Sequence, residues 1–332
     1  MNTPSELPAF LEARRLELPM DLAFAFERGP FDVGARRLAR VWQASLPPWR
    51  EAATGTVQGE VVTLRFATGA ESTGRFVRPA GQGPHPAVLL LHDHGGAFDH
   101  GWQKLFDDPG TQGSRGTHYD GQAPAQAFVD AGFAVLCLDA LGWGARQTGG
   151  YAGQQALAAN AQALGWSLAG LVAAEDAQAA AWLAAQPGID AGRMGAFGFS
   201  FGGLRAWQVA ALSAHIAAHA SLSWMACCVD LMRPGAPLLA GQSAFYMLHP
   251  KIAGRADFPD LAGLAARKPQ FYRSGRGDRH MPEDSVIRAW GRIARICRAA
   301  GGPRPDTALH DAGHTCPRET LAEAVAFLKT RL

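Results

Sequence analysis

The residue whose setting most favours chemistry is Ser200, in the segment GFSFGG at 198–203. An apolar run at 194–199 predicts a buried strand that ends there, and a helix is expected to follow. A serine on a sharp turn between strand and helix projects its hydroxyl from the sheet, while Gly198 and Gly202 leave room for the neighbouring segments. Free N–H groups at the start of the helix also favour a developing negative charge. The segment therefore predicts Ser200 as a nucleophile.

A serine hydroxyl needs a general base, and the base needs an acid that orients it. His314, in HDAGH at 310–314, follows the last candidate strand, and Asp278, in SGRGDRHMP at 274–282, follows the strand before it. The order nucleophile, acid, base, each after a strand, suits a parallel sheet. We therefore predict His314 as the base and Asp278 as the acid. The alternatives left open are His280 for the base and Asp311, Glu283 and Asp284 for the acid.

A second group must stabilise the oxyanion that forms when a carbonyl is attacked. The segment LLLHDHGG at 89–96 closes the first apolar run, and its two glycines let the backbone approach a substrate. We expect the backbone N–H groups of His94 and Phe201 to be the donors. Because these are backbone groups, replacing either side chain by alanine is expected to have a mild effect.

The same segment offers a metal-binding alternative. Four residues separate His94 from Asp99, whereas the H-x-H-x-D-H pattern of metallo-hydrolases has one residue there. No further set of ligands stands out, so neither a metal nor a cofactor is expected. A chelator would distinguish the two mechanisms, since a serine nucleophile with its base and acid needs no metal. The metal-binding side chains of this segment are His92, Asp93, His94, Asp99 and His100.

The elements that must position these residues alternate along the chain. Helical patterns at 124–131 and 167–186 lie between apolar runs, and two more lie near the C-terminus. This alternation predicts an α/β fold with a mostly parallel central sheet and helices on both faces. Residues 1–55 are expected to form a helical N-terminal extension packed on one catalytic domain at 56–332. The expected strands are 59–67, 74–79, 86–92, 133–139, 194–199, 270–274 and 307–310.

Taken with Asp278 and His314, the segments GFSFGG, HDHGG and DALGWGAR (139–146) resemble the α/β-hydrolase superfamily. Within it, the chain is similar to the dienelactone hydrolase-like and acetyl xylan esterase-like branch over about residues 57–332. The resemblance implies an α/β-hydrolase fold and a Ser–Asp–His triad. Two positions depart from it. Asp93 stands where many members have glycine, and Ser200 stands where dienelactone hydrolases proper carry cysteine, which favours ordinary ester hydrolysis.

Two long inserts, 97–121 and 224–262, are expected to border the site, since long loops often form lids. Their aromatic and sulfur-containing side chains have core packing as the alternative role. So many apolar side chains favour a small or aromatic substrate over a highly charged one. The candidates for lining the substrate pocket are Trp102, Trp143, Trp224 and Met225.

Composition excludes several classes of partner. The formal charge is +2 and basic residues are scattered, so no nucleic acid or membrane surface is expected. The N-terminus has no basic stretch leading into an apolar run, and the five cysteines show no disulfide spacing. We therefore expect a cytoplasmic protein with reduced thiols. The apolar stretch at 207–228 is better explained by a helix and a buried strand than by a membrane span. The oligomeric state is left open, a homo-oligomer included.

Together these features predict a serine hydrolase that cleaves a carboxylic ester of a small or aromatic substrate through an acyl-enzyme. The same machinery cleaves amide, thioester, lactone or carbon–carbon bonds, and these are the first alternative. A metal-dependent hydrolase and a non-catalytic binding protein are the others.

Overall fold

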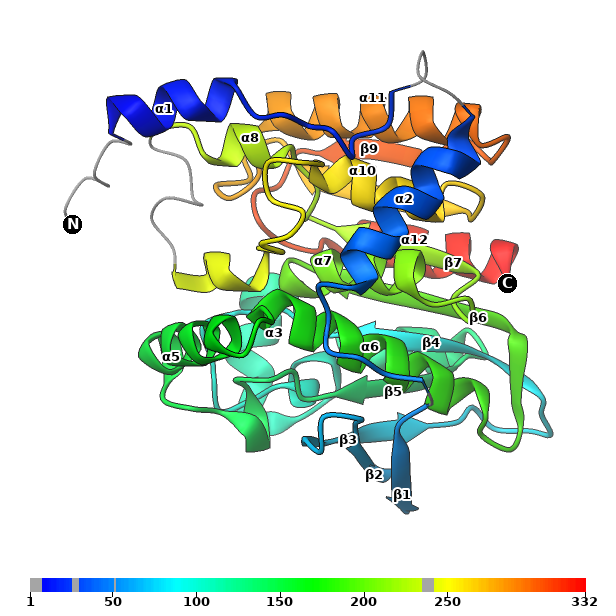
Figure 1. Cartoon of the computed structure of the whole chain (residues 1–332). Coiled ribbons are helices and arrows are strands. Elements are labelled where there is room, and N and C mark those ends of the chain that lie inside the picture. The colour runs from blue at the N-terminus through cyan, green and yellow to red at the C-terminus, as the bar shows by residue number, and fades with distance from the viewer. Residues whose placement is uncertain (1–7, 26–29, 51, 235–241) are drawn as a thin grey trace.

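One sheet organises the part of the chain that the structure describes. The computed structural model describes residues 8–25, 30–50, 52–234 and 242–332 (Figure 1). The strand order is β1-β2-β3-β5-β4-β6-β7-β8-β9, in which β1 to β3 pair antiparallel at one edge and the strands from β5 to β9 are parallel. The bounds are β1 Thr54–Gln58, β2 Val61–Arg65, β3 Glu71–Val77, β4 His85–Leu91, β5 Ala134–Leu138, β6 Ile189–Phe199, β7 Ala218–Leu222, β8 Gln270–Gly275 and β9 Asp306–His310.

Each strand expected from the sequence is present, and the mostly parallel α/β sheet is confirmed. In β4, Leu89 packs in the apolar cluster of one face and Leu90 in that of the other. Burial on both faces explains why such strands appear as continuous apolar runs. The sequence missed β1, because all five of its residues are exposed and it shows no apolar alternation.

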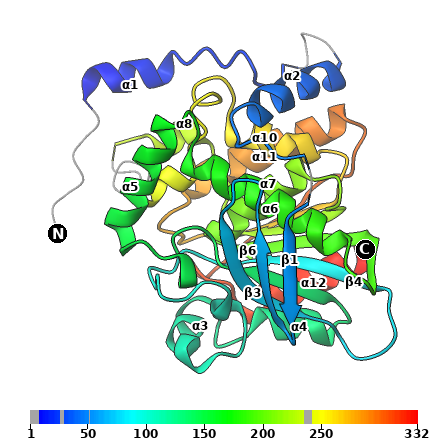
Figure 2. The ribbon, with the colours of Figure 1, turned by 60° about the horizontal axis from the view of Figure 1, so that its bottom comes forward.

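Helices cover both faces of the sheet, as Figure 2 shows. On one face lie α6 (Leu168–Ala184), α7 (Phe201–Leu212), α10 (Phe258–Ala262) and α11 (Glu283–Ala299). On the other lie α4 (Pro124–Asp130) and α12 (Arg318–Arg331), with α3 (Gln112–His118) beside them. The sequence missed α5 (Gly150–Ala163), in which glycine and glutamine interrupt the apolar pattern.

The N-terminal segment contributes two helices, α1 (Ala9–Leu16) and α2 (Phe31–Gln43). α2 buries Leu38 and Trp42, and the Trp42 ring lies 6.4 Å from that of Trp207 in α7. α1 buries none of its residues. Figures 1 and 2 place α2 beside α10 and α11.

The strand order places a topological switch between β4 and β6. From β4 the chain goes to β5 on one side, and it later returns to β6 on the other side. In open α/β sheets, ligands bind at the carboxyl ends of strands beside such a switch. The turn after β4 carries His94 and the turn after β6 carries Ser200, so both flank this position.

Within the described ranges, no single helix is long and apolar enough to cross a membrane. Only α5 and α6 taken together pass by length and composition, and they meet at an angle of 87°. The stretch at 207–228 divides between α7 and β7, the helix and buried strand that the sequence predicted. A short helix, α8 (Cys228–Leu231), starts at its end.

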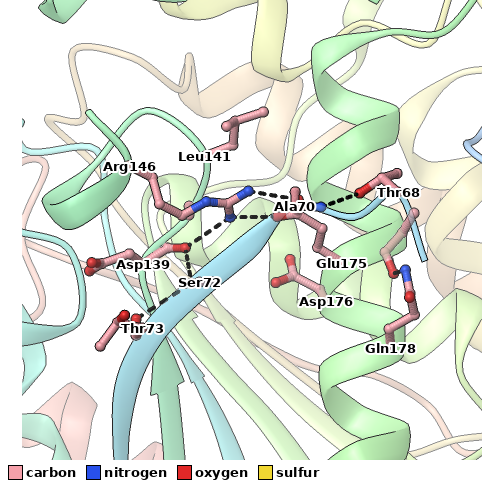
Figure 3. Close-up of polar contacts among 12 residues, drawn as sticks. Thr68, Ala70, Ser72, Thr73, Asp139, Leu141, Arg146, Glu175, Asp176 and Gln178 are labelled. Carbon is pink, nitrogen blue, oxygen red and sulfur yellow. Dashed lines mark hydrogen bonds and ion pairs between the residues drawn. The ribbon is translucent and has the colours of Figure 1, made fainter. Parts of the chain in front are cut away.

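Two ion pairs are buried between α6 and its neighbours. Arg205 in α7 binds Asp176 through contacts of 2.7 and 2.9 Å. Arg146 binds Glu175 through contacts of 2.7 and 2.8 Å, and the close-up in Figure 3 shows it lying between Asp139 and Glu175. A buried pair adds little net stability, but removing one partner leaves an uncompensated charge.

We therefore expect Asp176→Asn to lower the free energy of unfolding by about 3–5 kcal/mol. The matched control is Glu71→Gln, which breaks the exposed pair between Glu71 and Arg65 and should cost less than about 1 kcal/mol. Urea denaturation of both variants measures the difference. An equal loss of unfolding free energy in the two variants would show that burial of the ion pair does not determine its cost.

His249 is buried, and its ring packs edge-on against Trp42 at 5.4 Å. Burial lowers the pKa of its imidazole to about 3. The unfolded chain binds a proton near the ordinary pKa of about 6.5, so the folded state loses stability as the pH falls from about 6.5 towards 3. The stability that neutral His249 contributes is thus complete above this window.

We expect the free energy of unfolding of the wild type to fall more steeply between pH 6 and 4 than that of His249→Leu. The difference in slope should be about 1.4 kcal/mol per pH unit. His215→Leu is the control, because His215 is exposed in the folded chain, and it should keep the wild-type slope. If the free energy of unfolding had the same pH dependence in the wild type and in His249→Leu, the lowered pKa of His249 would be refuted.

Candidate active site

Three side chains far apart in the sequence form a continuous chain of hydrogen bonds. Nε2 of His314 lies 2.8 Å from Oγ of Ser200, and its Nδ1 lies 2.8 Å from Oδ2 of Asp278. Ser200 follows β6, Asp278 follows β8 and His314 follows β9, so the parallel sheet brings all three to one edge. This is the geometry in which a histidine can take the serine proton while a carboxylate fixes its tautomer.

The backbone at Ser200 is strained, as expected of a sharp turn between strand and helix. Its φ is +55° and its ψ is −123°. A Cβ at Gly198 would overlap the carbonyl of Gly202, and one at Gly202 would overlap the carbonyl of Leu91. Both glycines are therefore needed for close backbone contact, and the turn projects Ser200 beyond the end of β6.

Asp278 is held as an ionised acceptor. Its Oδ1 accepts hydrogen bonds from the N–H groups of His280 at 2.8 Å and Met281 at 3.2 Å. Burial raises the pKa of Asp278, but the hydrogen bond with His314 and the two N–H groups outweigh burial and lower the pKa below its ordinary value. The carboxylate can therefore stabilise a histidine that gains a proton.

The alternative acids lie in other interactions. Asp311 is exposed and lies 3.4 Å from Arg276, which also binds Glu283. Asp284 binds Arg233 and Arg288. None of these carboxylates has a described contact with His314.

The alternative base, His280, packs against the ring of His314 with ring centres 4.6 Å apart. Its Nε2 lies 3.0 Å from Nε of Arg279, and no bond to Ser200 occurs among the residues that the structure covers. Burial, aided by His314 and Arg279, lowers the pKa of His280 to about 4. His280 is thus a neutral neighbour of the proposed base.

The turn after β4 holds Asp93 and His94 in different directions. The Asp93 carboxylate is buried and accepts a hydrogen bond of 2.6 Å from the hydroxyl of Tyr119. The His94 ring accepts from the N–H of Gly96 at 3.2 Å, so its other nitrogen donates to Gln154 at 3.3 Å. Burial lowers the pKa of His94 to about 4, which keeps the ring neutral. The carboxylate that departs from the family pattern is therefore paired.

Four of the five metal-binding side chains of this segment are hydrogen-bonded to protein groups, Asp93 and His94 as described above. His92 accepts from the N–H of Ala140 at 3.0 Å and contacts the carbonyl of Asp93 at 2.9 Å through its other nitrogen. Asp99 accepts from Gln147 at 2.6 Å. Within the described ranges, no three His, Cys, Asp or Glu side chains converge as metal ligands.

An aromatic cluster adjoins the residue after the serine. The ring of Trp143 stacks on Phe201 at 5.1 Å, and Tyr246 meets Phe201 edge-on at 4.9 Å. Trp224 and Met225 belong to the same buried cluster. The insert at 97–121 contributes Phe98, which stacks on Trp143, and that at 224–262 contributes Tyr246, although its residues 235–241 lie outside the described part.

Trp102 lies apart from the other candidate pocket residues. It packs edge-on against Phe106 at 5.6 Å, in the cluster on the opposite face of the sheet. Its backbone N–H donates to Asp139 at 3.0 Å. No described contact joins it to Phe201 or His314, because in the short 3-10 helix at Trp102–Leu105 its side chain packs on Phe106 instead.

A buried arginine fixes the loop that carries Trp143. Arg146 binds Glu175 of α6 and also donates to the carbonyl of Asp139 at 3.2 Å (Figure 3). The hydroxyl of Ser72 donates to the same carbonyl at 2.7 Å. The segment DALGWGAR is therefore anchored to both β3 and α6, which sets the position of Trp143 beside Phe201.

Comparison with known proteins assigns the family. Residues 73–273 match the model of the X-Pro dipeptidyl-peptidase (S15) family. The chain belongs to the S15 family. Its fold is that of the α/β-hydrolases, so the expected superfamily is confirmed.

Individual proteins similar to this S15 family member include a sequence relative and two solved structures. "Putative hydrolase YtaP" of Bacillus subtilis is 27% identical over 263 residues, which cover 76% of this chain and 81% of the relative. A glucuronoyl esterase from Solibacter usitatus superposes with a TM-score of 0.65 at 15% identity, covering 90% of this chain and 91% of the other. Acetyl Xylan Esterase 1 from Thermoanaerobacterium sp. superposes with a TM-score of 0.57 at 18% identity, covering 98% and 99%.

The sequence missed two residues that hold the site of this S15 protein. They are Tyr119 and Lys104, both in the insert at 97–121, and both bind the turn after β4. Lys104 is one of four lysines in the chain and stands among aromatic and apolar residues in HGWQKLF at 100–106. A lysine within an apolar segment of a chain that has few lysines indicates a buried cation with acceptors nearby, and this pattern could have pointed to Lys104.

Asp278→Asn tests the role of the acid. The amide keeps the size of the side chain but not its charge, so the histidine loses its fixed tautomer, and kcat should fall about 10³–10⁴-fold. Steady-state hydrolysis of a p-nitrophenyl ester measures it. Asp311→Asn is the control and should retain wild-type kcat, since the Asp311 side chain is 97% exposed. Loss in the control, with Asp278→Asn active, would assign the acid to Asp311 instead.

Proposed function

We propose that this S15 family member is a carboxylic ester hydrolase that works through an acyl-enzyme on Ser200. The observation that carries the proposal is the unbroken hydrogen-bond chain from Ser200 through His314 to Asp278, with both contacts at 2.8 Å. Oγ of Ser200 attacks the ester carbonyl while Nε2 of His314 accepts its proton. His314 then gives that proton to the departing alkoxide, and the released product is an alcohol.

The second half of the cycle reverses the roles. A water molecule attacks the acyl carbon while His314 removes its proton, and the bond to Ser200 Oγ breaks as His314 returns a proton to it. In both halves the oxyanion is stabilised by the N–H groups of Phe201, at the N-terminus of α7, and of His94. These steps need no cofactor, and the expected setting is the cytoplasm.

The substrate is a small or aromatic ester. Phe201 follows the nucleophile directly in sequence and packs on the rings of Trp143 and Tyr246, so the surroundings of Ser200 on this side are apolar. Such surroundings suit an apolar acyl or alcohol group. The chain shares its fold with proteins named as glucuronoyl and acetyl xylan esterases, and this supports ester cleavage as the reaction.

Cleavage of a peptide amide is the second candidate, because the matching family is named for an X-Pro dipeptidyl-peptidase. Removing a dipeptide requires recognition of a free N-terminal ammonium, for which a carboxylate is the natural partner. Asp278 is engaged with His314, and Asp93 with Tyr119. Neither is available to an ammonium, which favours the ester.

A fluorophosphonate probe tests the nucleophile, because an activated serine displaces fluoride and forms a stable phosphonate ester. We expect mass spectrometry to locate the adduct on Ser200, and Ser200→Ala to lose both labelling and hydrolysis of p-nitrophenyl acetate by about 10⁴-fold or more. Ser223→Ala is the matched control, since Ser223 also follows a parallel strand with a positive φ of 49°, and it should retain both.

Two further measurements discriminate the alternatives. Activity that survives Ser200→Ala and disappears with a chelator would move the chemistry to the metal-binding side chains between His92 and His100. Cleavage of Ala-Pro-p-nitroanilide at a higher kcat/KM than p-nitrophenyl acetate would replace the ester by the amide. A wild-type protein that neither labels nor hydrolyses any of these compounds would be a binding protein.

A further inference from the structure

A fully buried lysine lies directly behind the turn that follows β4. Lys104 has 0% exposure, and its Nζ donates to the carbonyl of His94 at 2.7 Å and to that of Asp93 at 3.2 Å. Burial lowers the pKa of Lys104, while the carboxylates of Asp93 and Asp139 oppose that shift. Burying a lysine costs free energy unless it is paired. We therefore looked for a role of Lys104 that offsets this cost.

The two carbonyl contacts fix the direction of the neighbouring N–H groups. The carbonyl of Asp93 and the N–H of His94 belong to one planar peptide unit, in which they point in opposite directions. Because Lys104 holds the carbonyl, the N–H of His94 must point away from Lys104. It donates to no acceptor among the described residues, whereas the carbonyl of His94 accepts a second bond, from Nε1 of Trp143, at 3.0 Å.

Two other side chains each reach one of these carbonyls: Nδ1 of His92 lies 2.9 Å from that of Asp93, and Nε1 of Trp143 donates to that of His94. Among the described residues, only Lys104 donates to both. Gly95 and Gly96 follow with positive φ values of 59° and 69°, in a region where glycine moves with little steric cost. A rotated peptide would present a carbonyl oxygen instead of an N–H to the reacting carbonyl, and a carbonyl dipole repels an oxyanion. Because the buried ammonium binds two successive carbonyls, it fixes the orientation of both peptide units at once.

We propose that Lys104 is the positioning residue of the oxyanion site: its buried ammonium holds the carbonyls of Asp93 and His94 and so aims the N–H of His94 at the tetrahedral intermediate. The inference rests on the proposed function, because it assumes that His94 donates to the oxyanion. Lys104 touches neither substrate nor Ser200, and it acts through the turn.

The chain provides a matched control in Lys268. Its Nζ also donates to two backbone carbonyls, those of Ala210 and Ser213, both at 2.7 Å. These residues lie at the C-terminal end of α7, at the opposite end of the helix from Ser200. Replacing Lys268 therefore removes the same kind of interaction from the same fold without touching the oxyanion turn.

The experiment compares Lys104→Met with Lys268→Met in the whole protein. Steady-state hydrolysis of p-nitrophenyl acetate gives kcat and KM, and the inhibition constant of phenylboronic acid reports binding of a tetrahedral anion on Ser200. For Lys104→Met we expect kcat to fall about 10- to 100-fold with KM within about twofold, since only the transition state uses the turn. The inhibition constant should rise by a similar factor.

Lys268→Met should keep the wild-type kcat and boronate inhibition, although its melting temperature is expected to fall. Lys104→Gln, which keeps an N–H donor in the same space, should recover part of the lost kcat, and it replaces Lys104→Met if that variant does not fold. Each variant is compared at equal concentrations of folded protein, as judged by circular dichroism.

Two results would overturn the inference while leaving the proposed function intact. One is a folded Lys104 variant with wild-type kcat and boronate affinity in a protein whose activity depends on Ser200. The other is an equal loss of kcat in Lys268→Met, which would show a general effect of removing a lysine that binds backbone carbonyls. A wild-type protein without Ser200-dependent hydrolysis would instead overturn the proposed function itself.

Discussion

The hydrogen bonds that join Ser200, His314 and Asp278 impose the main constraint on this molecule. They require the turns after β6, β8 and β9 to lie at one edge of the sheet, with Ser200 and Asp278 each 2.8 Å from a nitrogen of His314. Parallel strands meet this requirement, because their carboxyl ends lie on the same side. The apolar runs that bury both faces of the sheet therefore also determine where the reactive groups lie.

Close backbone packing and strain serve the same requirement. Gly198 and Gly202 permit the contacts that allow Ser200 to adopt its positive φ, and Gly275 permits a similar approach to the carbonyls of Ala312 and Gly313 just before His314. Ser200 keeps this conformation because its N–H also bonds to the carbonyl of Leu222 at 2.9 Å. This hydrogen bond to β7 thus stabilises the strained backbone conformation of Ser200.

A layer of buried polar groups lies behind the site. Tyr119 binds the Asp93 carboxylate, Lys104 binds two carbonyls of the same turn, and Arg146 anchors the loop of Trp143 to α6. Each of these side chains makes hydrogen bonds that offset part of the free-energy cost of its burial. Together they hold the turn after β4 and the aromatic side chains beside Phe201 without contacting Ser200.

The sequence by itself determined the strands, the superfamily and the candidate residues Ser200, Asp278 and His314. These features are local: an apolar run consists of consecutive residues, and the glycines of GFSFGG lie within two or three positions of Ser200. Only the tertiary structure decided that Asp93 pairs with Tyr119, that Lys104 is buried behind His94 and that Trp102 packs on the opposite face. Those outcomes depend on contacts between segments distant in sequence, which no local pattern records. The exposed strand β1 was missed for a related reason, since pairing with β2 rather than burial defines it.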